Sequence, residues 1–208
     1  MSTTEHLPAT DEVHPPAEPG VTSDVEDFAQ QIADQVESFL LALQAIARGE
    51  AGGRAIGLLL LEVSQVLLAG ARLGVQTDFE PVEQFQPDAG PDPDLDEMRL
   101  RLATLLDGVD DYTEVFDPYV HPPELVSSRL SDDLSSVAAA LAHGLRHFRA
   151  GRISEALWWW QFSYVSSWGG EASGALRALQ SVVAHDRLDI DLEGESEQVA
   201  AAEQMLES

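Results

Sequence analysis

The chain has 208 residues, of which 44% are hydrophobic, and its formal net charge is −26. This length allows one domain with tails, and the absence of cysteine excludes a disulfide framework, a thiolate metal site and a cysteine nucleophile. The negative charge disfavours nucleic acid and anionic membranes as direct partners, because phosphate groups would be repelled. No basic N-terminal region precedes an apolar run, so we expect no signal peptide and a cytoplasmic protein.

The two ends of the chain differ in composition from its middle. Residues 1–22 are rich in proline and acidic residues, which is typical of a disordered tail. Residues 188–208 are acidic again, and only Ser196 to Leu206 has the pattern of a weak helix. Residues 23–187 show helical periodicity without strand-like alternation. We therefore predict an all-α, single-domain bundle of about six helices with disordered acidic tails.

The predicted helices follow one another along residues 23–187. The second, from about Ala55 to Leu73, is apolar nearly all round, which favours the middle of a bundle; the polar residues within it argue against a membrane span. A long acidic loop over residues 75–92 carries spaced aromatic side chains, so we expect it to lie over the bundle. Val109 to Tyr119 is expected to be a short helical or irregular aromatic segment.

The segment Ile153 to Gly170 contains all four tryptophans and is predicted to be a helix that ends at Gly169-Gly170. A short turn at Gly151 joins it to the preceding helix, which predicts an antiparallel helical hairpin. Gln161 falls on the apolar side, where its amide needs hydrogen-bond partners. Trp159 falls on the other side among serines. It is either an anchor for a partner or second packed layer, or part of an ordinary aromatic core.

Several charged residues are candidates for binding or chemistry. Glu62 lies in the apolar second helix, either as a buried functional acid or as a partly exposed or arginine-paired side chain. Arg146, Arg149 and Arg152 gather at the turn of the tryptophan hairpin. They are candidates for binding an external anion or, as we favour, the protein's own acidic loop or tail.

The sequence carries no motif for a phosphate loop, a dinucleotide site, a nucleophile elbow or a zincin. His143 and His147 are four residues apart and share one helix face, which allows a metal site. A third ligand is not evident, so two ordinary histidines are the favoured interpretation. We therefore predict neither a metal nor a cofactor.

Four runs of residues resemble a family of uncharacterised all-helical proteins from actinobacteria. They are Leu58 to Gln65, Glu114 to Tyr119, Ile153 to Tyr164 and Leu176 to Ser181, and the resemblance spans roughly residues 24–189. Members of the family have no assigned activity and tend to be encoded near a recombination mediator protein. The resemblance implies at most a loose link to DNA recombination or repair.

Two functions are compatible with these sequence features. The first is a non-catalytic interaction or adaptor protein that acts through the tryptophan hairpin or the acidic surfaces on an unidentified protein partner. The alternative is a small-molecule or metal-dependent helical-bundle enzyme that uses Glu62 or the pair of His143 and His147. The first needs no motif, whereas the second needs a convergent polar site that the sequence does not display.

Overall fold

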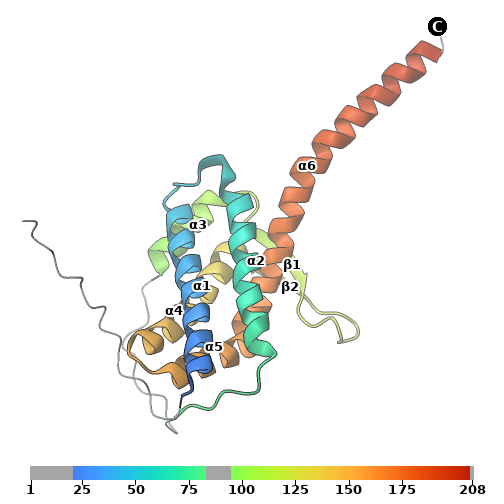
Figure 1. Cartoon of the computed structure of the whole chain (residues 1–208). Helices are drawn as coiled ribbons and strands as arrows, with labels where there is room; N and C mark the ends of the chain where they lie inside the picture. Colours follow the sequence, from blue (N-terminus) through green and yellow to red (C-terminus); the bar gives the residue numbers. More distant parts are fainter. Residues whose placement is uncertain (1–20, 83–94, 207–208) are drawn as a thin grey trace, which may run out of the picture.

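The computed structural model describes the backbone over residues 21–82 and 95–206 and the side chains over 21–82 and 95–188. Most of the predicted N-terminal tail and of the predicted loop 75–92 therefore lies outside the described residues. Within them the fold is an all-α bundle, as predicted (Figure 1). Its helices are α1 (Ser23–Ala47), a 3₁₀ turn (Gly52–Arg54), α2 (Ala55–Gly74), α3 (Asp96–Leu105), α4 (Leu130–Arg149), α5 (Ile153–Ser163) and α6 (Gly169–Leu206).

The helices bury their apolar faces in one common core. In α1 the buried residues Ile32, Val36, Phe39 and Leu43 recur every three or four positions, which is the spacing that places side chains on one face of a helix. Helix α2 packs against α1, α5 and α6. By length and composition alone, Gly52–Gly74 is the one described stretch that would suffice to cross a membrane.

Helices α4 and α5 form the predicted antiparallel hairpin. The turn contains Gly151 at φ 74°, a left-handed conformation that glycine adopts without a steric penalty. Trp160 is fully buried, and its indole N–H donates to the carbonyl of Leu141 over 3.0 Å. A Cβ atom at Gly144 would lie 2.2 Å from Nε1 of Trp160, so the hairpin requires glycine at this position.

The prediction that Gly169-Gly170 ends the tryptophan helix is wrong. The chain passes from α5 through a π-helical turn, Tyr164–Trp168, directly into α6. This turn requires glycine at position 169, because a Cβ atom there would clash with the carbonyl oxygen of Tyr164 at 2.4 Å. Helix α6 then continues to Leu206 and projects from the bundle (Figure 1). A sixth helix was predicted only from about Ala172 to His185, followed by a tail with a weak helix.

An antiparallel β-hairpin precedes α4, and it corrects the expectation of a helical or irregular segment without strands. Strands β1 (Asp111–Val115) and β2 (Leu125–Arg129) pair in register from Asp111 with Arg129 to Val115 with Leu125. The strands are short, and β1 turns polar and apolar side chains to both of its faces. No clear apolar alternation therefore marks the segment in the sequence.

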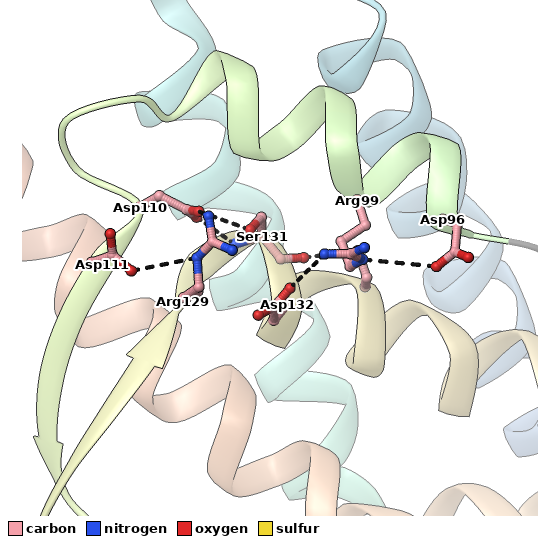
Figure 2. A network of polar contacts seen from close by, with 8 residues as sticks. Asp96, Arg99, Asp110, Asp111, Arg129, Ser131 and Asp132 are labelled. Atoms are coloured by element: carbon pink, nitrogen blue, oxygen red, sulfur yellow. Dashed lines mark hydrogen bonds and ion pairs between the residues drawn. The ribbon is translucent and has the colours of Figure 1, made fainter.

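Asp110 attaches the base of this hairpin to the start of α4 (Figure 2). Its buried carboxylate accepts hydrogen bonds from the backbone N–H and the hydroxyl of Ser131, over 2.8 and 2.9 Å. Arg129 pairs with the same carboxylate over 2.8 Å. An aspartate distant in sequence thus provides the anionic cap that a helix N-terminus favours. Beside it, Arg99 of α3 pairs with Asp132 over 3.2 Å.

Candidate binding site between the β-hairpin and the last helix

A cavity of about 1090 Å³ lies between the β-hairpin and α6. We call it the β1–α6 groove. Residues 111–116 form one wall without interruption, and α6 forms the other. The hairpin lies beside the first half of α6 in Figure 1. This volume is at the upper end of ligand-binding clefts.

The wall formed by α6 consists largely of small side chains. Gly170, Ser173, Gly174, Ala178 and Ser181 all line the groove. Their spacing places them along one side of the helix. A Cβ atom at Gly174 would lie 2.1 Å from Oε2 of Glu114 and 2.6 Å from the hydroxyl of Tyr112. The absence of a side chain at Gly174 therefore lets two β1 side chains reach the surface of α6.

Carboxyl groups from three elements gather beneath these contacts. The hydroxyl of Tyr112 donates a hydrogen bond to Asp133 of α4 over 2.8 Å. Burial, together with the nearby negative charges of Glu171 and Glu114, raises the pKa of Asp133 to about 6, although the Tyr112 hydrogen bond acts in the opposite direction. Burial also raises the pKa of Glu114. No arginine in the described ranges forms an ion pair with these carboxylates.

The mouth of the groove is apolar and exposed to solvent. Phe116 is 74% exposed and Leu125 is 68% exposed, and Val115 and Val165 are exposed beside them. All four residues line the groove. Adjacent exposed apolar side chains of this kind commonly mark a binding surface. The groove thus combines exposed apolar side chains with an excess of acidic ones, since Asp111, Glu114 and Glu171 line it together with Arg177.

Trp159 does not lie on an open surface. It is half-buried, its indole N–H donates to the carbonyl of Ala140 over 2.8 Å, and its ring centroid lies 4.3 Å from that of His143. Trp159 was predicted to be either an anchor for a partner or part of a second packed layer. Its contacts with Ala140 and His143 place it in a second packed layer on α4. The exposed aromatic ring of α5 is Phe162, which is 52% exposed and stacks on Trp158.

The predicted arginine cluster at the hairpin turn is partly engaged within the protein. Arg149 forms an ion pair with Glu37 of α1. Arg146 donates to Nδ1 of His143 over 2.8 Å. The partner of Arg149 thus lies in α1 and not in the acidic loop or tail that was predicted. Arg152 precedes α5, and its backbone N–H bonds to the carbonyl of His147 over 3.0 Å.

Gln161 has the partners that a buried amide requires. Its Oε1 accepts from the backbone N–H of Phe79 over 2.8 Å, and its Nε2 donates to the carbonyl of Leu73 over 3.0 Å. Glu155, also buried, accepts from the backbone N–H of Val82 over 3.1 Å. These contacts hold the described start of the predicted loop against α5. Gln161 is therefore part of the scaffold.

Glu62 and the two histidines do not line the groove. Glu62 is half-buried on α2, and burial raises its pKa. His147 is fully buried, not on the surface, and its Nε2 lies 3.3 Å from Nε2 of His143. Burial, followed by repulsion from His143, lowers the pKa of His147. Across the described ranges, no three His, Asp or Glu side chains are arranged to hold a metal ion.

Sequence reasoning missed the residues that form the groove. Tyr112 and Glu114 fall in the segment from Val109 to Tyr119 that was expected to be helical or irregular, and Glu171 was not singled out. The alternation of Tyr112 and Glu114 with Asp111, Thr113 and Val115 was the available signal, but it extends over five residues only. Their meeting with α4 and α6 depends on tertiary contacts that no local pattern predicts.

A helical bundle with a β-hairpin against its last helix defines the structural class, and the comparisons with known proteins agree with it. The chain belongs to the family described as a domain of unknown function (DUF5063), whose model matches residues 23–185. No curated protein matches the chain. The crystal structure of protein BF1032 from Bacteroides fragilis is similar at a TM-score of 0.60 and 17% identity, over 74% of this chain and 91% of that chain. At this identity the similarity concerns the fold alone.

Proposed function

We propose that this protein is a non-catalytic interaction protein whose protein partner binds in the β1–α6 groove. The observation that supports the proposal is the groove itself, which is large and bordered by exposed apolar side chains of the hairpin and the π turn. Partner-binding surfaces commonly combine buried apolar anchors with a polar surround. Phe116, Leu125 and Val165 would supply the anchors at the mouth of the groove.

The polar groups of the groove suit binding better than catalysis. A catalytic site needs a nucleophile or an acid–base pair held at hydrogen-bond distance from a position that substrate can occupy. Here the hydroxyl of Tyr112 donates to Asp133, but Asp133 does not itself line the cavity where a substrate would lie. The residues of the enzyme alternative, Glu62 and the two histidines, lie on α2 and α4 outside the groove.

The charge of the chain indicates what kind of partner suits the groove. With a formal net charge of −26, the protein would attract basic surfaces and repel acidic ones at long range. A basic protein of DNA recombination or repair fits this charge. The link to that process rests on the family resemblance drawn from the sequence.

A blocked groove tests the proposal. Ser181 lines the groove, whereas its neighbour Gln180 is exposed on α6 outside it. We expect the full chain to capture a protein from its host and the purified pair to bind. Ser181→Trp should abolish that binding, and the matched variant Gln180→Trp should leave it unchanged. Equal binding by both variants would exclude the groove as the site, and turnover of a substrate by the purified protein would favour the enzyme alternative.

A further inference from the structure

One edge of β1 carries peptide groups that point away from the hairpin. The backbone N–H of Leu130 bonds to the carbonyl of Asp110, and that of Phe116 bonds to the carbonyl of Glu124. In an antiparallel pair such hydrogen-bonded positions alternate with positions that point outward. The peptide groups of Asp111, Thr113 and Val115 therefore point away from β2.

This outward edge faces the β1–α6 groove. Residues 111–116 line the groove consecutively, as expected when the edge of a strand borders the cavity. Among the described residues, the outward N–H groups of Asp111, Thr113 and Val115 donate no hydrogen bond to a backbone carbonyl. Unpaired strand edges are templates for another strand, and proteins commonly protect them with lysine, proline or a bulge. Strand β1 has neither lysine nor proline, and its pairing with β2 is continuous.

We infer that β1 accepts an extended segment of a basic partner protein as a third strand, laid along the outward edge of β1 in the groove. The inference rests on the proposed function and specifies how the partner binds. Main-chain hydrogen bonds to Asp111, Thr113 and Val115 supply the affinity in this mode, and pockets for alternate side chains supply the specificity. At Gly174 the side chains of β1 occupy the surface of α6, and beyond it Ala178 and Ser181 line the groove with small side chains.

The acidic residues of the groove specify the side chains of that segment. Side chains two positions apart in a strand lie on one face. Basic side chains at alternate positions would therefore project together toward Glu114 and Glu171, which line the groove and lack an arginine ion-pair partner among the described residues. The remaining positions, if apolar, would lie on the face of Val115 and its cross-strand partner Leu125, both of which are exposed and line the groove. The fitting segment alternates arginine or lysine with apolar residues.

Proline substitutions separate this mode from other uses of the groove. Thr113 and Ser127 face each other across the hairpin, and both point their peptide groups outward, on opposite edges. Thr113→Pro removes a donor from the groove edge, and Ser127→Pro removes one from the far edge. Proline is tolerated at such edge positions. Circular dichroism and thermal unfolding of both variants establish that the hairpin persists.

The probe is an acetylated, amidated hexapeptide of alternating valine and arginine, titrated into the full chain at low salt. We expect this peptide to bind the unmodified chain. Thr113→Pro should weaken its affinity by about tenfold, because one main-chain hydrogen bond to the peptide is lost. Ser127→Pro should leave the affinity unchanged. A valine–glutamate peptide and a peptide with N-methylated valine amides should not bind. Equal binding of the methylated peptide, or no binding by the valine–arginine peptide, would overturn the strand-addition mode.

Amide hydrogen exchange followed by NMR gives the second readout. Binding of the peptide should slow exchange at Asp111, Thr113 and Val115, whose N–H groups gain partners, and change it little at Tyr112 and Glu114. Slower exchange confined to α6 would instead mean that the peptide lies on the helix, which contradicts the inference.

The strand-addition mode can be wrong while the proposed function is right, and the variants distinguish the two cases. If Ser181→Trp abolishes partner binding while Thr113→Pro does not affect it, the groove binds the partner without strand addition. If sedimentation shows a dimer of the chain that Thr113→Pro dissociates, the edge pairs with a second copy, and the inference about a basic partner is overturned.

Discussion

Trp160 of α5 packs closely against α4 in the α4–α5 hairpin. It is fully buried against Gly144, and its indole N–H is satisfied by the carbonyl of Leu141. Trp159, one position earlier, is half-buried, and its indole N–H likewise donates a hydrogen bond to the carbonyl of Ala140. The two adjacent tryptophans therefore differ in burial while sharing one mode of hydrogen bonding.

This difference predicts unequal losses of stability. Trp160→Ala should lower the free energy of unfolding by about 3–5 kcal/mol, as for other large aromatic side chains removed from a core. Trp159→Ala should cost about 1–3 kcal/mol, because it removes a half-buried ring and one hydrogen bond. Urea titrations of the two variants measure both values. Losses of the same size for both would contradict the difference in packing.

Asp133 makes the stability of the fold depend on pH. Its pKa rises from 3.8 to about 6 in the folded protein, mainly through burial. Between about pH 4 and 6 the native state then binds more protons than the unfolded chain, so the contribution of Asp133 to stability falls as pH rises through this window. Glu114 and Glu62 shift in the same direction.

Removing this charge should stabilise the protein at neutral pH. Asp133→Asn keeps an acceptor for the hydroxyl of Tyr112 and cannot ionise. Because Asp133 is only half-buried, solvent screening limits the gain at pH 7 to about 1 kcal/mol. Urea unfolding at pH 4, 5, 6 and 7 would show this gain at pH 7 and none at pH 4. A gain of the same size at every pH would mean that the charge of Asp133 is not its cause.

At the scale of elements, Asp110 decides where the hairpin meets the bundle. Asp110→Ala should lower the free energy of unfolding by about 1–3 kcal/mol, since it removes the cap of α4 and the hydrogen bonds to Ser131. Asp111→Ala is the matched control, because Asp111 is exposed and pairs with Arg129 over 3.4 Å. It should cost less than about 1 kcal/mol. Thermal unfolding that ranks Asp111→Ala as the more damaging change would contradict the role given to Asp110.

The elements also show what a sequence can and cannot predict. Helices α1, α2 and α4 were predicted because their apolar residues repeat over five or more turns. The hairpin was missed, since five-residue strands with mixed faces leave no such repeat. The predicted stop at Gly169-Gly170 failed because these glycines serve close packing against Tyr164 and an open groove wall.

The candidate site escaped prediction for a related reason. Tyr112, Glu114, Asp133 and Glu171 come from three segments of the chain, and only the close approach at Gly174 brings β1 to α6. By contrast, the need of Gln161 for hydrogen-bond partners followed from one polar residue on an apolar helix face. Its bonds to Phe79 and Leu73 meet that need.

At the scale of the whole molecule, α6 extends from the bundle as a projecting arm (Figure 1). The β1–α6 groove is lined by α6 residues within 170–185, in the first half of this helix. A chain with a net charge of −26 should bind a basic partner with strong dependence on salt, because screening weakens long-range attraction. In the proposed complex, the groove is the place where the partner binds.

Hydrogen–deuterium exchange of the full chain, alone and with its captured partner, tests the central claim most directly. We predict slower exchange over residues 109–116 and 170–185 in the complex, with Ser181→Trp abolishing the effect and Gln180→Trp retaining it. Slower exchange elsewhere, with both of these ranges unchanged in a saturated complex, would contradict the claim that the β1–α6 groove is the binding site.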